Sequence, residues 1–247
     1  MSGHSKWANI KRKKAKVDAV KGNVFSRLTK EIMAAAKRGG GNPDTNFKLR
    51  IAIDKAKANN LPAANIERAI RRATGQEAGV SYEEAVYEGY GPGGTAVYME
   101  ILTDNRNRTA GEVRHIFSRH GGSLGETGCV AWMFEPKGRL VLGETTLGEE
   151  ELLDIAIEAG ADDLSQDEGE SVVLTAPELL DEVRQAFEEK GIHVEEAELV
   201  RLPKTTVAIA GHEAEQLMEL LDLLEEHDDI QKVYSNADFP DEMLEEA

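Results

Sequence analysis

The order of elements expected between Arg139 and Leu202 constrains the fold of this chain most. We expect RLVLG to form a strand, GEEELLDIAIEAG a helix, ADDL and ESVVLTA two strands, PELLDEVRQAFEEKG a helix and HVEEAELVRL a strand. β-Branched residues mark the strands, and apolar residues at helical spacing mark the helices. The resulting order, βαββαβ, is typical of a ferredoxin-like fold.

The segments on either side predict a second α/β domain. Strand–helix–strand patterns lie near residues 95–136, where GCVAWMFEP is the closing strand, and near 205–235, where TTVAIAG is the opening strand. The predicted class is α+β: an N-terminal all-helical domain plus two ferredoxin-like (split βαβ) domains, one inserted into the other. This arrangement needs only short connections. Two α/β domains in tandem are the alternative.

The expected boundaries follow from this arrangement. Residues 1–78 are expected to form a basic helical domain, residues 79–136 and 204–240 a discontinuous α/β domain, and residues 137–203 the inserted α/β domain. Within the helical domain, KGNVFSRLTKEIMAAAKRGGG predicts a helix with Lys30, Lys37 and Arg38 on its solvent side. A second helix is expected from Asp44 to Asn59 and a third after Pro62, ending near Thr74.

Charge is divided sharply along the chain. Residues 1–75 hold 18 Lys and Arg against 5 Asp and Glu, a balance of +13; the acidic part, residues 76–247, holds 11 against 41, a balance of −30. Their sum is the formal net charge of −17. Opposite signs in two parts of one chain indicate a polyanion-binding module attached to an acidic body.

The basic charge is densest at the start, in SGHSKWANIKRKKAK, which has no acidic residue. Contiguous like charges repel unless an anion joins them, so phosphate binding is favoured over a solvated face or a membrane surface. Trp7 either stacks on a base or packs against the helices behind it. The predicted nucleic-acid-binding residues are Lys6, Trp7, Lys11, Arg12, Lys13, Lys14, Lys16, Lys21, Lys30, Lys37, Arg38, Arg68, Arg71 and Arg72.

A second basic motif, DNRNRT, lies in the acidic part of the chain. Arg106 and Arg108 are secondary candidates for phosphate contact, because they precede a helix expected to begin at Thr109 with Glu112 completing a capping box. Ion pairs within the domain are the alternative role. The nearby GGSLGETG is a candidate loop that closes over a bound strand.

Patterns that carry catalysis are not found in the sequence. GYGPGG matches G-x-G-x-x-G but precedes a strand, so we predict a turn. Histidine spacing does not suit a metal, and Cys129 is expected to be buried in a strand. We therefore expect no catalytic residue, no cofactor and no metal. A small-molecule-sensing regulatory protein, or an enzyme without a recognisable active site, is the alternative.

The location is expected to be the cytoplasm. A single cysteine allows no disulfide within the chain, and no apolar run is long enough to span a membrane. The acid-free start leaves a mitochondrial transit peptide as an alternative. The expected partner is DNA or ribosomal RNA with the ribosome, with no membrane partner, and the chain is expected to be a monomer, with a dimer as the alternative.

Several motifs in order resemble the YebC family: GHSKWANIKRKKAK, GGGNPD, YEGYGPGG, DNRNRT and GGSLG. The resemblance covers essentially the whole chain, and the family includes the mitochondrial translational activator of cytochrome oxidase subunit one. It implies three domains, one α/β domain inserted in the other, and a non-enzymatic protein. Members are described either as DNA-binding transcriptional regulators or as translation factors that associate with ribosomes, and both roles suit the basic domain.

Overall fold

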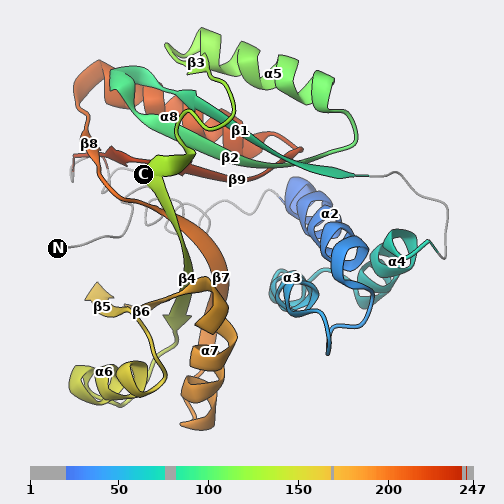
Figure 1. Ribbon diagram of the computed structural model, residues 1–247, viewed down its shortest axis with the longest axis vertical. Coiled ribbons are helices and arrows are strands. Elements are labelled where there is room, and N and C mark those ends of the chain that lie inside the picture. The colour runs from blue at the N-terminus through green and yellow to red at the C-terminus, as the bar shows by residue number, and fades with distance from the viewer. Residues whose placement is uncertain (1–20, 76–81, 168–169, 241–242, 244–247) are drawn as a thin grey trace. The chain divides into compact units, whose positions relative to one another are not determined.

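Figure 1 shows the computed structural model, which describes residues 21–75, 82–167, 170–240 and 243. The fold is α+β, with an N-terminal helical region and two α/β domains, one inserted into the other, as predicted. Residues 134–202 form one compact unit, and the chain on either side of them forms the other. None of the described helices is both long and apolar enough to cross a bilayer.

The helical region contains α2 (Lys21–Gly39), α3 (Phe47–Ala58) and α4 (Ala63–Ala73). The second helix begins three residues later than predicted, because Asn46 caps it by accepting a hydrogen bond from the Leu49 amide at 3.2 Å. Gly40, at a φ of 85°, lets the chain leave α2. Small and branched side chains pack the three helices together, chiefly Leu28, Ile32, Ala36, Leu49, Ala52, Ala56, Leu61, Ile66 and Ala69.

The outer α/β domain is built on a four-stranded sheet in the order β3-β1-β2-β9. Its elements are β1 (Glu83–Tyr90), β2 (Ala96–Thr103), α5 (Arg106–Arg119), β3 (Ser123–Leu124), α8 (Gly211–Glu226) and β9 (Ile230–Ser235). β1 lies between β2 and β3, so β2-α5-β3 is a split βαβ unit. The buried cluster that joins both helices to the sheet includes Val97, Met99, Val113, Phe117, Leu217, Leu220, Leu224 and Val233.

Two segments that were predicted to form strands of this sheet do not do so. GCVAWMFEP does not form one strand, because Ala131–Met133 is a short 3-10 turn and β4 (Phe134–Leu142) begins the inserted domain instead. TTVAIAG contributes only β8 (Val207–Ala208), which pairs in parallel with β10 (Ala237–Asp238) in a separate sheet. β1 and β3 take the two places in the main sheet that these segments were expected to fill. The predicted turn at GYGPGG is confirmed: β1 ends at Tyr90 within the motif, Pro92–Gly94 forms a 3-10 turn, and β2 begins at Ala96.

The inserted domain follows the predicted order. After β4 come α6 (Glu149–Glu158), β5 (Asp163–Asp167), β6 (Glu170–Thr175), α7 (Leu180–Glu189) and β7 (Val194–Pro203). The strand order β5-β6-β4-β7 is that of a ferredoxin-like sheet, with the first and third strands of the unit adjacent at its centre. Leu140, Leu152, Val173, Val183 and Phe187 are fully buried in this domain.

Candidate nucleic-acid interface

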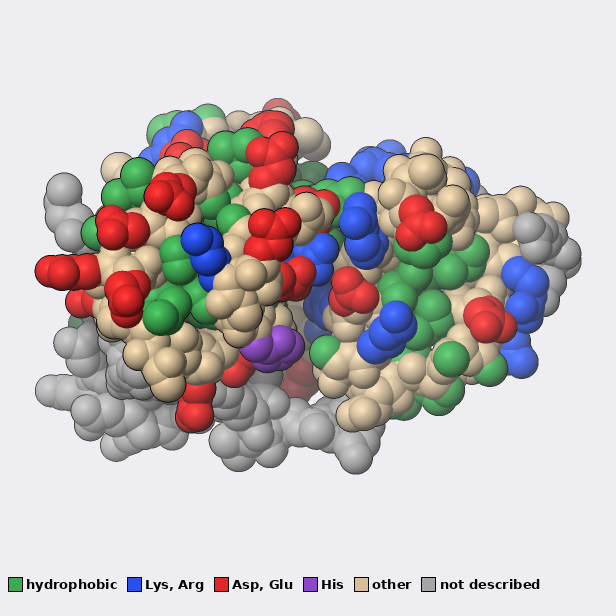
Figure 2. Space-filling view, turned by 90° about the horizontal axis from the view of Figure 1, so that it is seen from below, with side chains coloured by type: hydrophobic (Ala, Val, Ile, Leu, Met, Phe, Trp, Pro, Cys, Tyr) green, Lys and Arg blue, Asp and Glu red, His purple; other side chains and the backbone are tan. Residues whose placement is uncertain are grey.

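Exposed basic side chains lie on all three described helices of the helical region. Lys37 and Arg38 end α2, and Arg68 and Arg72 lie on α4, with Arg71 half-buried beside them. α3 adds Lys48 and Lys57, which were not among the predicted residues. In Figure 2, Lys and Arg side chains (blue) are spread over the right-hand part of the view, which the helical region occupies. This surface offers several cations at once to an extended polyanion.

The most basic part of the predicted interface lies outside the described residues. It comprises Lys6, Trp7, Lys11, Arg12, Lys13, Lys14 and Lys16. Lys21 begins α2, but its side chain is also outside the described part. The role of these residues therefore stays a prediction from the sequence.

Lys30 corrects the predicted solvent side of α2, because it is buried. Its ammonium group lies 2.8 Å from Asp229 Oδ1, donates to the Asp228 carbonyl at 2.9 Å and lies 5.6 Å from the centre of the Tyr82 ring. The neighbouring predictions hold better: Lys37 and Arg38 are exposed, although Arg38 also pairs with Glu84 at 2.6 Å. Helical periodicity correctly places Lys30 outside the three-helix core. The side chain is nevertheless buried, because Asp228 and Asp229 of the outer α/β domain contact it.

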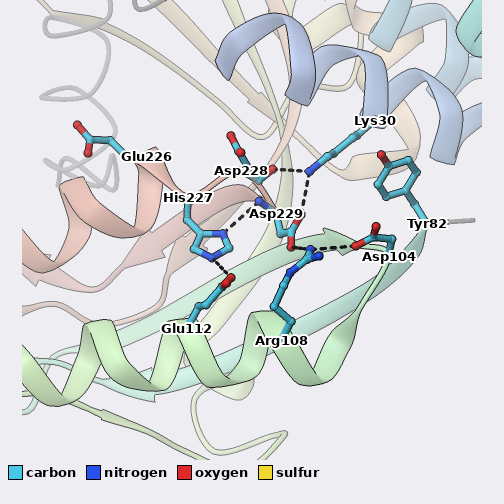
Figure 3. Close-up of a pocket in the computed structure, with 9 residues that line it drawn as sticks. All are labelled: Lys30, Tyr82, Asp104, Arg108, Glu112, Glu226, His227, Asp228 and Asp229. Carbon is cyan, nitrogen blue, oxygen red and sulfur yellow. Dashed lines mark hydrogen bonds and ion pairs between the residues drawn. The ribbon is translucent and has the colours of Figure 1, made fainter. Parts of the chain in front are cut away.

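Asp229 is the centre of a buried ionic cluster that Figure 3 shows in close-up. The carboxylate accepts hydrogen bonds from Lys30, from Arg108 at 2.7 Å, and from the hydroxyls of Thr109 at 2.8 Å and Thr103 at 3.0 Å. Burial by itself raises the pKa of Asp229, but the hydrogen bonds from Lys30, Arg108 and Thr109 outweigh it and hold that pKa well below its usual range. Asp229 therefore stays ionised.

Two residues of the DNRNRT motif, Asp104 and Arg108, form ion pairs in this cluster. Arg108 bridges Asp229 and Asp104, the latter at 2.9 Å, which is the ion-pairing role that was the alternative for it. Asn105 caps α5 by accepting from the Arg108 amide, so the predicted cap at Thr109 is wrong and the helix begins three residues earlier. Arg106, the other secondary candidate, is exposed and is not among the residues that line this cluster. It remains a candidate phosphate contact.

A polar hollow of about 540 Å³ opens beside the cluster. Asp104, Glu112, Glu226, Asp228 and Asp229 outnumber the two cations that line it, Lys30 and Arg108. An excess of carboxylates repels a phosphate, so this hollow does not extend the basic surface.

Three side chains in the hollow have metal-binding atoms close together: Glu112, His227 and Asp229. These atoms are already engaged. The Asp229 amide donates to His227 Nδ1 at 3.1 Å, which leaves the proton on Nε2 to donate to Glu112 at 3.0 Å. Asp229 accepts from two cations and two hydroxyls. The group is complete as a hydrogen-bonded cluster and does not present a vacant ligand set.

The GGSLGETG loop is held by a residue that the sequence pattern did not single out. Glu88 is 2% exposed, and its carboxylate accepts the backbone amides of Gly128, Val130 and Ala131 at 2.6–2.8 Å. The carbonyl of Glu88 accepts the Gly125 amide as well. These bonds fix the loop, which does not favour the predicted role as a closing flap.

Cys129 directly follows this loop and is half-buried outside any strand, so the predicted buried position in a strand is wrong. Burial and the nearby Glu88 raise the pKa of its thiol, which disfavours a nucleophilic thiolate. Trp132, which follows, is 65% exposed with its indole N–H bonded to the Cys129 carbonyl at 3.1 Å. It is an aromatic surface residue that the sequence analysis missed.

Comparisons with known proteins extend over the whole chain. Residues 5–76 match the model described as "TACO1/YebC protein N-terminal domain", and residues 82–237 match "TACO1/YebC second and third domain". A "Probable transcriptional regulatory protein" from Desulfitobacterium hafniense is 56% identical, with 100% of this chain and 99% of that one covered. One of the same name from Dictyoglomus turgidum is 53% identical over 99% of each chain.

A solved structure is similar as well. The crystal structure of a conserved hypothetical protein from Aquifex aeolicus superposes with a TM-score of 0.83 at 47% sequence identity. The match covers 92% of this chain and 93% of that one.

Replacing the central carboxylate tests the ionic cluster. Asp229→Asn should lower the free energy of unfolding by about 3–5 kcal/mol, because it leaves buried Lys30 without a counter-charge. Asp228→Asn is the matched control, since that side chain is exposed, and should change it by less than about 0.5 kcal/mol. Urea unfolding followed by circular dichroism measures both. Equal stabilities of the two variants would contradict the cluster's role.

The same cluster predicts a dependence of stability on pH. Because folding lowers the pKa of Asp229, its contribution is fully present above the unfolded pKa of about 4 and is lost as pH falls toward the folded value. The difference in stability between wild type and Asp229→Asn should therefore shrink below about pH 4. A difference that does not change on acidification would show that another group supplies the stability.

Proposed function

The chain belongs to the TACO1/YebC family, and on that premise we propose that it is a non-enzymatic regulator of gene expression that binds nucleic acid through its basic helical domain. The names of its relatives support a regulatory role. The proposal places the protein in the cytoplasm as a monomer that needs no cofactor or metal. DNA in transcription and ribosomal RNA in translation are the two targets that suit the interface.

The separation of charge is the observation that carries this proposal. The helical domain presents Lys37, Lys48, Lys57, Arg68 and Arg72 to solvent, while the part of the chain after residue 75 has a balance of −30. Phosphates are attracted to the first surface and repelled by the second. The acidic part therefore orients the molecule, so that nucleic acid meets the helical domain.

A DNA target is supported by the geometry of α3 and α4. Asn60, at a φ of 60°, and buried Leu61 make a short turn between the helices, and Asn65, Arg68 and Arg72 share one exposed side of α4. A helix-turn-helix protein reads the major groove with such a second helix.

An RNA target is supported by the composition of the interface. Many cations together with Trp7 suit recognition of RNA by shape, phosphate contact and stacking. We favour RNA slightly, because such recognition does not require the paired half-sites that a helix-turn-helix dimer reads.

Charge reversal at the start of the chain tests the interface. Replacing Lys11, Arg12, Lys13 and Lys14 with Glu should abolish binding to both DNA and RNA oligonucleotides, measured by fluorescence anisotropy. For the wild type, log K against log salt should have a slope of roughly −4 to −7, as expected for about five to eight neutralised phosphates. Lys190→Glu with Lys204→Glu is the control in the acidic part and should keep binding. Binding that is independent of salt, or that survives the reversal, would place the site elsewhere.

Sedimentation of cell extract separates the two targets. If the protein acts in translation, it should move with ribosomal particles in a sucrose gradient, resist DNase and be released by RNase or high salt. If it acts in transcription, it should stay at the top of the gradient and protect particular promoter fragments from cleavage. A saturable thermal shift with a small molecule, in the absence of both kinds of binding, would favour the alternative of a metabolite sensor.

A further inference from the structure

The inserted domain exposes two neighbouring apolar side chains on α6. Leu153 is 40% exposed and Ile157 is 64% exposed. They lie four residues apart and so form one stripe along the helix. Among the described residues, large hydrophobic side chains with this degree of exposure are few, and these two are adjacent.

This stripe is not needed to close the core of the domain. Leu152 and Ala156, one position before each of the exposed pair, are the buried residues of α6. One residue along a helix turns the side chain by about 100°, so Leu153 and Ile157 lie on a flank of the helix beside the buried face. These two neighbouring apolar side chains are therefore available for contact with a partner.

The surroundings of the stripe are strongly acidic. Glu150, Asp154 and Glu158 are exposed on α6 itself. Between Leu140 and Val183 the sequence has 14 Asp and Glu and no Lys or Arg. An apolar stripe bordered by one sign of charge selects a partner of the opposite sign.

We propose that the α6 surface, formed by Leu153 and Ile157 with Glu150, Asp154 and Glu158, docks a basic amphipathic segment of a partner protein. Apolar side chains of that segment cover the stripe, and its Lys and Arg residues pair with the bordering carboxylates. Nucleic acid does not fit, because the surface has no cation to offer phosphate. A second copy of this chain does not fit either, since a symmetric contact would place the two acidic surfaces against each other.

A model peptide tests this docking surface in the full chain. A labelled amphipathic helix of leucine and lysine, LKKLLKLLKKLLKL, should bind the wild type, and the double variant L153A/I157A should weaken its affinity about tenfold, measured by anisotropy. Alanine keeps the helix, which circular dichroism verifies. Leu223→Ala is the matched control, because Leu223 is 39% exposed on α8, and should leave the affinity within about twofold.

Four outcomes would overturn the proposal. The first is equal affinity of the peptide for wild type and L153A/I157A. The second is weaker binding of an oligouridylate to L153A/I157A, which would make α6 a nucleic-acid site. The third is tighter peptide binding when Lys11, Arg12, Lys13 and Lys14 are replaced with Glu, which would show that the chain's own start occupies the surface. The fourth is loss of a dimer in L153A/I157A by sedimentation, which would identify a second copy as the partner.

Discussion

A single buried carboxylate, that of Asp229, holds together segments that are far apart in the sequence. Lys30 reaches it from α2, Thr103 from the end of β2, and Arg108 and Thr109 from the first turns of α5. The Asp229 carbonyl also accepts the Leu102 amide at 2.8 Å, where β9 begins beside β2. A buried charge is tolerated only with such partners, so the cluster fixes where these segments meet. The exposed basic residues of α2 to α4 are thereby presented from a defined surface.

The inserted domain was predictable because each of its elements carries a strong pattern, and its strand order agrees with that prediction. The outer domain was predicted less well for a physical reason. GCVAWMFEP has the composition of a strand, but the carboxylate of Glu88 binds the amides of Val130 and Ala131 and keeps them out of a ladder. Nothing in the sequence around Glu88 indicates that its side chain will be buried and will bind the backbone of a segment about forty residues away.

In the candidate interface, too, the sequence predicted exposure that depends on nearby residues but missed contacts with distant ones. Helical periodicity located the exposed side of α4 and the end of α2, because those depend only on the three-helix core. It misplaced Lys30, because a carboxylate 199 residues away covers that side chain. The sequence also allowed either phosphate contact or ion pairing for Arg108. In the structure its guanidinium forms ion pairs with Asp104 and Asp229. Basic composition therefore overstates the number of cations free for phosphate.

The two proposals assign different partners to two surfaces of opposite charge: nucleic acid to the basic helical domain, and a basic protein segment to the acidic inserted domain. Acetylation of lysines, followed by mass spectrometry with and without a bound oligonucleotide, tests this division most directly. Lys37, Lys48 and Lys57 should become protected, while Lys190 and Lys204 in the acidic part should react equally in both samples, and Lys30 should react slowly in each. Protection of Lys190 and Lys204 to the same extent as the lysines of the helical domain would contradict it.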